Sequence, residues 1–432
     1  MEPAGASEAT DPTLLPGSGV ESSSPASRPP LRPLRQVFRA PAFRRLFLAQ
    51  TISRWGDTFN AVALVILVFR LTGSGLRVAG TVAFEIAPVL LLGFFAGAIV
   101  DRHPRRRIMI TADLGRAAVC LALVVFGENL AVIYAAAFGL SVGTVFFNPA
   151  ATSLMPTVVD RDDIVSANSA LWSAAVISQI VLAPLAGALV AFAGAGPAFL
   201  VNAASFVISA ALLRGLPTSL AAASGGGRRL GEVAEGLRLI RGNRFLSTLA
   251  GVQLLAALSA GATSALLVVL ADRHLDVGPS RFGVLIAAIG VGAGLGPLVL
   301  RRLIADSRRP GVLFGPYLLR GGVDLTLAAS SSFGVAVVAL GAYGIGTSTG
   351  MVTFNSVLQT TVPDRMRGRV FAFYDVVWQG ARLVSIAVGG VLADAIGVRA
   401  VYVFGGLLLL VAGALGLVRL RRADLADAAS VP

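Results

Sequence analysis

The chain has 432 residues, of which 55% are hydrophobic and only 14% are charged. Its mean hydropathy of +0.79 excludes an ordinary soluble domain, in which about a quarter of the residues are charged. The formal net charge is +13, yet every basic residue is an arginine, and most of them flank long apolar segments. We therefore predict that this charge faces anionic lipid headgroups and not nucleic acid.

Residues 1–43 are rich in Pro, Ser, Gly and Ala, which predicts a disordered tail. The apolar segments that follow are continuous, and most are close to the about 20 residues that a helix needs to cross a bilayer. Since only helices and closed barrels satisfy their backbone in lipid, we predict an all-α membrane protein with about twelve transmembrane helices. The expected helices are 46–69, 76–100, 108–126, 130–158, 164–192, 197–213, 245–270, 282–300, 312–329, 333–362, 370–394 and 400–417.

These helices fall into an N-terminal half, 44–216, and a C-terminal half, 244–420, joined by a polar linker, 217–243. In the linker, apolar residues from Leu230 to Ile240 recur at helical spacing among charged residues. This pattern predicts an amphipathic helix at the membrane surface. Residues 421–432 are expected to be a second tail.

Arginine is unequally distributed between the two sides of the predicted bundle. One set of loops holds only Arg70, Arg77, Arg273, Arg281 and Arg399, whereas the tails, the linker and the other loops hold most of the rest. Because cytoplasmic loops carry an excess of arginine, we predict that both termini are cytoplasmic and that the protein lies in the cell membrane.

An internal repeat relates the two halves. Asn148 precedes Pro156 at the same spacing as Asn355 precedes Pro363, and each asparagine follows a phenylalanine. Parallel halves related by an axis along the membrane normal are typical of transporters in which one half rocks against the other. The repeat therefore predicts two pseudo-symmetric six-helix halves.

Residue types that carry enzyme or metal chemistry are scarce. Cys120 is the only cysteine, which excludes an internal disulfide and a thiolate metal cage. The two histidines, His103 and His274, are far apart in the chain, and no Gly-rich phosphate loop or nucleophile elbow occurs. We predict no metal, no cofactor and no enzyme activity.

A glycine, an aspartate and an arginine cluster end the second predicted helix. Its notable residues are Gly97, Asp101, Arg102, Arg105 and Arg106. This segment resembles the loop signature of the major facilitator superfamily. The resemblance implies that Asp101 contacts the start of the eleventh helix, near residues 367–369, and holds a cytoplasmic gate closed; a carboxylate is favourable at a helix N-terminus.

Further segments resemble the macrolide-efflux and enterobactin-exporter branch, the transmembrane secretion effectors. They are Ser53-Arg54-Trp55-Gly56-Asp57, Leu71-Thr72-Gly73-Ser74, Asp113-Leu114-Gly115-Arg116, Glu235-Gly236-Leu237 and Arg367-Gly368-Arg369-Val370. The resemblance covers about residues 44–417 and implies transport by alternating access, but no particular substrate.

Charged residues inside the predicted helices need a reason, because a charge at the bilayer centre costs about 3 kcal/mol or more. Arg54 and Asp57 share one helix face, and Glu85 has no opposite charge within a turn. We interpret these three as candidates for proton coupling. The alternatives are that Arg54 and Asp57 form a neutral pair that only permits insertion into the membrane, and that Glu85 is a carboxylate that stays hydrated. Two further sets are predicted to be gate or scaffold ion pairs, namely Asp113 with Arg116 and Arg320 with Asp324.

The remaining polar residues of the helices are few, which favours a lipophilic or amphipathic substrate. The candidates for the substrate cavity are Asn60, Gln179, Gln253, Tyr343, Asn355, Trp378, Gln379 and Arg382. We predict that Arg382 either meets an anionic part of the substrate or pairs with Glu85.

The leading prediction is a secondary active transporter that exports a small amphipathic or lipophilic compound, such as a drug, siderophore or metabolite, in exchange for protons. It is expected to function as a monomer in the lipid bilayer. Two alternatives stay open: an importer of a nutrient or metabolite with the same fold, and a membrane scaffold or sensor that transports nothing.

Overall fold

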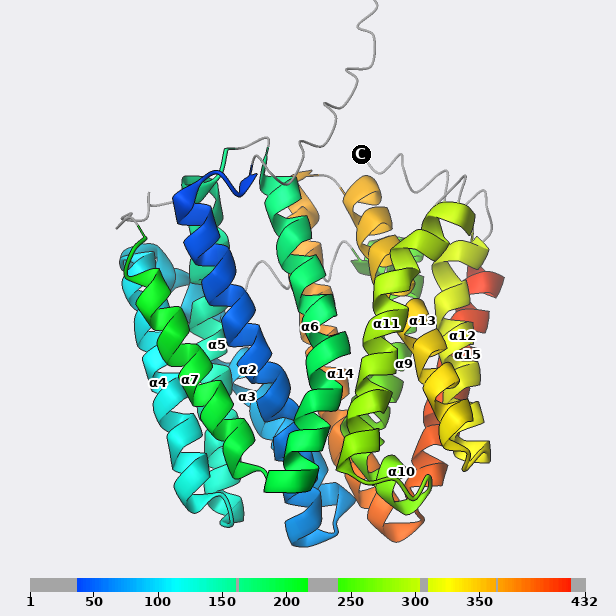
Figure 1. The fold of residues 1–432 in the computed structure, drawn as a ribbon. Coiled ribbons are helices and arrows are strands. Elements are labelled where there is room, and N and C mark those ends of the chain that lie inside the picture. Colours follow the sequence, from blue (N-terminus) through cyan, green and yellow to red (C-terminus); the bar gives the residue numbers. More distant parts are fainter. Residues whose placement is uncertain (1–36, 161–162, 217–239, 304–309, 363, 421–432) are drawn as a thin grey trace, which may run out of the picture.

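A computed structural model of the chain describes residues 37–160, 163–216, 240–303, 310–362 and 364–420 (Figure 1). These residues form helices and no strand. The helices of the first half are α2 (Pro41–Thr72), α3 (Gly75–Arg102), α4 (Arg105–Phe126), α5 (Leu130–Val158), α6 (Ile164–Ala193) and α7 (Gly196–Leu213). Those of the second half are α9 (Arg244–Ala265), α10 (Leu267–Arg273), α11 (Pro279–Leu303), α12 (Pro310–Ala329), α13 (Phe333–Thr361), α14 (Asp364–Ala395) and α15 (Val398–Arg419).

Local sequence signals set several helix ends. The side chain of Asn129 accepts a hydrogen bond from the Ala131 amide at 2.9 Å and caps α5, and Asn243 caps α9 through the Leu246 amide at 3.0 Å. Gly73, with φ of 61°, ends α2 in the left-handed conformation. Asparagine and glycine are typical of these cap positions.

The predicted membrane helices are confirmed, with small changes. Among the described residues, 11 helices are long and apolar enough to cross a bilayer; α12 is less apolar because it carries Arg320 and Asp324. The expected helix 245–270 is divided at Leu266 into α9 and α10, and α14 begins at Asp364, before the predicted residue 370. The predicted amphipathic helix lies almost wholly in 217–239, outside the described residues.

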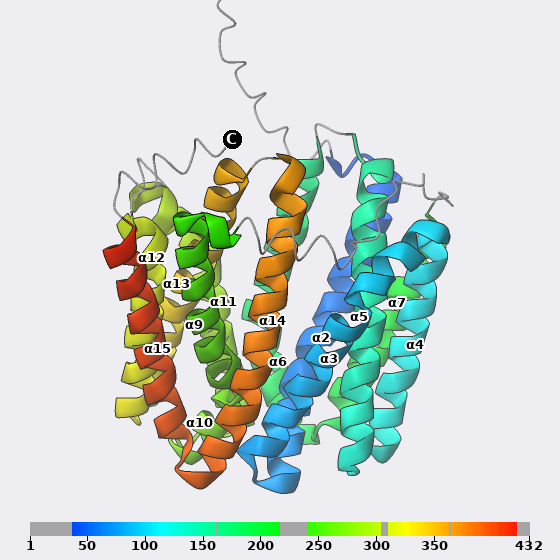
Figure 2. The same ribbon diagram turned by 180° about the vertical axis from the view of Figure 1, so that it is seen from behind.

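Helix packing shows the pseudo-symmetry directly. In the first half α2 packs on α6 and α7, α5 packs on α3 and α4, and α4 packs on α7. In the second half the corresponding pairs are α9 with α14 and α15, α13 with α11 and α12, and α12 with α15. The predicted two six-helix halves are therefore confirmed, and they meet along α3 with α14 and α6 with α11 (Figures 1 and 2).

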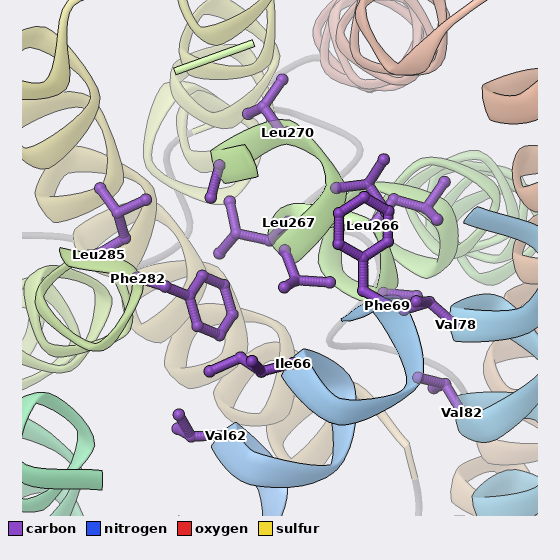
Figure 3. Close-up of a cluster of buried hydrophobic side chains, with 14 of the residues drawn as sticks. Val62, Ile66, Phe69, Val78, Val82, Leu266, Leu267, Leu270, Phe282 and Leu285 are labelled. Atoms are coloured by element: carbon purple, nitrogen blue, oxygen red, sulfur yellow. The ribbon is translucent and has the colours of Figure 1, made fainter. Parts of the chain in front are cut away.

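A buried apolar cluster closes the bundle at the end that carries α10, here called the α10 side; α2 begins and α15 ends on the opposite, termini side (Figure 1). In the cluster Val62, Ile66 and Phe69 of α2 lie beside residues of α3, α10 and α11, so both halves contribute (Figure 3). Leu266 and Leu285 are fully buried there. Because apolar burial excludes water, this cluster seals the α10 side.

Glycines allow the two halves to approach closely on the same side. A Cβ on Gly283 of α11 would lie 2.7 Å from the Cα of Pro184 in α6, and one on Gly390 of α14 would lie 2.9 Å from the Cα of Leu76 in α3. Small residues permit such backbone contact between membrane helices. The α10 side is thus closed by packing as well as by the apolar cluster.

Replacing Gly292 with valine is expected to destabilise the second half by about 1–3 kcal/mol, as overpacking does. A side chain there would collide with the backbone of Gly341 in α13, and this contact lies within one half, so rocking of the halves cannot relieve it. Thermal unfolding of the purified protein in detergent measures the effect. Gly322→Val is the control, because a Cβ there would have no atom of another helix within 4 Å; equal melting temperatures would contradict the prediction.

Candidate functional site

A cavity lies between the two halves and reaches the seal of the α10 side. Its inner part has a volume of about 460 Å³ and is lined from both halves, by α2, α6, α9, α10 and α11. Val62 and Phe282, which belong to the apolar cluster, form its closed end. An outer part of about 860 Å³ shares Arg54, Trp172 and Ala175 with the inner part and extends toward the termini side.

Two of the three proton-coupling candidates lie on this cavity. Arg54 and Asp57 both line its inner part, with Arg54 exposed and Asp57 half-buried. Their spacing on α2 puts them on one face, and Arg116 is a second cation that acts on Asp57. A carboxylate here can exchange a proton with water in the cavity.

Glu85 forms an electrostatic link between the halves. It is half-buried in α3, and Arg382 of α14 acts on it with opposite charge, while Asp57 acts on it with the same charge. A direct pairing of Arg382 with Glu85 stays a prediction. Asp57, Glu85 and Arg382 make a charged series that runs from the first half to the second.

The first half supplies a polar wall that the sequence analysis underestimated. The outer cavity is lined by amides and hydroxyls of α2, α5 and α6, from Gln50, Asn148, Thr152, Asn168 and Ser173. The sequence marks Asn148 only as part of the repeat, because a single sequence does not show which face of a helix meets the cavity. Gln179, a predicted cavity residue, lines the inner part.

The second half contains an aromatic recess. The recess has a volume of about 340 Å³, lies among α9, α12, α13 and α14, and is lined by Tyr317, Phe354, Phe371, Tyr374 and Trp378. The predicted cavity residues Gln253, Asn355 and Trp378 all line it. Gln253 accepts a hydrogen bond from Tyr317 at 3.0 Å, and the Asn355 amide donates to the Met351 carbonyl at 2.8 Å.

Other predicted cavity residues have different surroundings. Asn60 is buried. It lies one turn after Gly56, where an added Cβ would collide with Asn202 and Ser205 of α7. Asn60 therefore lies on the side of α2 that packs against α7. Tyr343 accepts a hydrogen bond from Arg320 at 2.9 Å. Gln379 is half-buried in α14, outside the residues that line the cavity parts described above.

The two predicted ion-pair sets each lie within a single half. Asp113 and Arg116 of α4 form a direct, buried ion pair. The Arg116 guanidinium lies 4.8 Å from the ring of Phe147 in α5 and 4.2 Å from that of Phe206 in α7. This stack joins α4, α5 and α7, a scaffold arrangement; the gate role stays a prediction.

The second set differs from the first in its hydrogen bonds. In α12, Arg320 donates to Tyr343 of α13, and Asp324 accepts a hydrogen bond from Ser259 of α9 at 3.5 Å. Its position in the second half corresponds to that of the first set. Each residue hydrogen-bonds to a neutral hydroxyl of a neighbouring helix, while Arg320 and Asp324 also act on each other with opposite charge.

The arginines after α3 bind backbone carbonyls at helix ends. Arg105 donates to the Ser153 carbonyl of α5 at 2.8 Å, and Arg106 donates to the Leu216 carbonyl after α7 at 2.7 Å. Arg102 is exposed at the end of α3. The surroundings of Gly97 and the side chain of Asp101 lie outside the described part of the structure, so the predicted contact of Asp101 with the eleventh helix stays a prediction.

Two similar halves around a central cavity define a membrane transporter of the major facilitator type. Sequence comparison agrees: the profile of the transmembrane secretion effectors matches residues 30–432, and the chain belongs to this family. It is therefore a transporter and not an enzyme.

Relatives of known name are also transporters. The multidrug efflux pump Tap of Mycolicibacterium fortuitum is 29% identical over 417 residues, which cover 90% of this chain and 98% of that protein. Macrolide efflux protein A of Streptococcus pyogenes is 23% identical over 85% of this chain and 93% of its own. Among solved structures, a bacterial homologue of the iron transporter ferroportin in its inward-facing state matches with a TM-score of 0.66 and 18% identity, over 90% of this chain and 99% of that one; this likeness concerns the fold.

Proposed function

We propose that the protein exports a small amphipathic compound from the cytoplasm in exchange for protons. The observation that carries the proposal is the cavity between the halves, which is closed on the α10 side and has a polar wall. The proposal takes the aromatic recess of the second half as the opposite wall. A polar wall offers hydrogen bonds and an aromatic wall offers apolar contact, so together they suit a ligand with two such faces.

The orientation follows from arginine. The termini side carries most of the arginines, which favours the cytoplasm for that side. With this orientation the structure is an inward-facing state, ready to take a compound from the cytoplasm or the inner leaflet. A single chain supplies both walls, so a monomer is sufficient.

Proton coupling is assigned to Asp57 and Glu85. Both are half-buried carboxylates near the cavity, and each has a cation close by, Arg54 for Asp57 and Arg382 for Glu85. Protonation of Glu85 removes its attraction to Arg382 in the other half. It therefore changes the electrostatic link between the halves, which is what coupling to a conformational change requires.

Export of drug-like compounds is the direction that the relatives support. The names of Tap and macrolide efflux protein A describe efflux. Compounds with a lipophilic ring system and a polar edge are the class that fits the two walls.

Transport in everted membrane vesicles tests the proposal. A panel of amphipathic drugs, siderophores and polar nutrients is offered with and without an imposed pH gradient, acid inside. The expected result is accumulation of one or more amphipathic compounds that depends on the gradient. Accumulation of polar nutrients in right-side-out vesicles instead would support the import alternative, and no movement of any compound by folded protein would contradict export.

A further inference from the structure

A carboxylate bridges the two halves at the closed α10 side. Asp394, near the end of α14, accepts hydrogen bonds from the Gly75 amide at 2.8 Å and the Leu76 amide at 3.1 Å. It also accepts one from the Ser74 hydroxyl at 2.5 Å. All three donors lie at the start of α3, in the other half, so one side chain caps a helix that is distant in the sequence.

The start of α3 is built to receive this carboxylate. The first amides of a helix have no partner within the helix, and the helix dipole favours an anion there. Gly75 lets the carboxylate approach, because a Cβ at this position would lie 3.3 Å from an Asp394 oxygen. Hydrogen bonds to an ionised acceptor are stronger than neutral ones.

A cation of the second half strengthens the same contact. Arg273, at the end of α10, lies 3.7 Å from an Asp394 carboxylate oxygen. It also donates to the Gly73 carbonyl, between α2 and α3, and its guanidinium lies 5.5 Å from the Phe69 ring. The residues Gly73 and Ser74, noted in the sequence only as a family resemblance, are thus contact points between the halves.

The two halves also cross where α6 packs on α11, which corresponds by pseudo-symmetry to the crossing of α14 with α3. At the α6–α11 crossing the helices pack closely without a carboxylate at the position that corresponds to Asp394. Gly187 corresponds to Gly390 and Gly194 to Gly397 in the repeat, which places Ala191 where α14 has Asp394. The α6 crossing closes by glycine contact, with a Cβ on Gly187 only 3.1 Å from the Gly283 nitrogen. Of the two crossings between the halves, the described residues show a charged cap at the α3–α14 crossing.

We propose that Asp394 is a positioning residue of the transport cycle, a latch that holds the α10 side closed. Its donors and its carboxylate belong to different halves, so opening on the α10 side must break all of these hydrogen bonds. The opposite ends of the same two helices carry Asp101, at the end of α3, and Arg367-Gly368-Arg369, at the start of α14. The family resemblance predicts a contact of Asp101 with the start of α14, so the same helix pair would carry a second latch at its other end, and alternating access requires that the two latches open in turn. This inference rests on the alternating access of the proposed function.

Thiol labelling tests the latch without any substrate. Ser264 is exposed in the inner cavity, and Ser264→Cys in a Cys120→Ser background reports access to the cavity through a membrane-impermeant maleimide. In intact cells Asp394→Asn is expected to raise the labelling rate by about tenfold, because the amide keeps one acceptor but loses the charge and the second acceptor. In everted vesicles the rate is expected to fall.

Three further variants make the outcome decisive. Ser74→Ala, which removes a single hydrogen bond, is expected to give a smaller shift in the same direction, and Asp101→Asn a shift in the opposite direction. Glu128→Gln, an exposed carboxylate on the same side of the molecule, is expected to leave labelling unchanged. Equal rates for Asp394→Asn and Glu128→Gln in folded protein would overturn the latch. A labelling shift without transport of any compound would keep the latch and reject the proposed export.

Discussion

Replacing Asp57 with asparagine is expected to reduce gradient-driven transport to the level of vesicles without the protein. Asparagine is close in shape to aspartate but does not bind or release a proton, so the inward flow of protons is no longer coupled to outward movement of the compound. Exchange of labelled for unlabelled compound, which needs no net proton movement, is expected to continue. The measurement compares the two modes of transport in the same everted vesicles.

Glu85→Gln separates the roles of the two carboxylates. If Glu85 carries the transported proton, its variant also loses gradient-driven transport and keeps exchange. If Glu85 serves only to pair with Arg382 across the halves, its variant slows both modes alike. Asp272→Asn, an exposed carboxylate of α10, is the control and is expected to behave like the wild type. Gradient-driven transport that survives in both Asp57→Asn and Glu85→Gln would contradict proton coupling through these residues.

Arg116→Met is expected to destabilise the folded protein by about 3–5 kcal/mol, since it leaves the Asp113 charge buried without its partner. The same change removes the contacts of the guanidinium with Phe147 and Phe206. Thermal unfolding in detergent, followed by intrinsic fluorescence, measures the loss. The loss of stability is expected to appear as a lower melting temperature, which this measurement reports independently of transport.

A double variant distinguishes a buried ion pair from a packing effect. Asp113→Leu combined with Arg116→Met replaces both charges by apolar groups, and such replacements are often neutral. The double variant is therefore expected to be more stable than Arg116→Met alone. A double variant no more stable than the single one would show that the loss in Arg116→Met comes from the aromatic contacts, which both variants lack, and not from an uncompensated Asp113 charge.

Much of the fold could be predicted from the sequence because lipid imposes a local requirement. Each membrane helix needs one continuous apolar segment, so the segment alone shows where the helix lies. The expected helix 130–158 coincides with α5, and most other ends differ by a few residues. The division at Leu266 was missed because the apolar segment continues through it.

The site was less predictable, because a helix in lipid is apolar on most of its faces and its periodicity does not show which face meets a cavity. Gln179 lines the inner cavity and Trp378 lines the aromatic recess, whereas Asn60 packs toward α7; a role of Gln179 or Trp378 in substrate binding stays a prediction. The polar wall with Gln50 and Asn168 was missed for the same reason. Helix contacts decide these positions, and they join residues far apart in the chain.

The sequence by itself determined the class of protein, the helices, the two-fold repeat and the family resemblance, since each of these is present in local composition or in short motifs. Only the tertiary structure decided which charges meet. Asp394 bonds to Ser74 across 320 positions of the chain, Glu85 of one half lies near Arg382 of the other, and Arg116 stacks between rings of two neighbouring helices. Such pairings depend on how the helices pack against one another, and no local pattern in the chain records that.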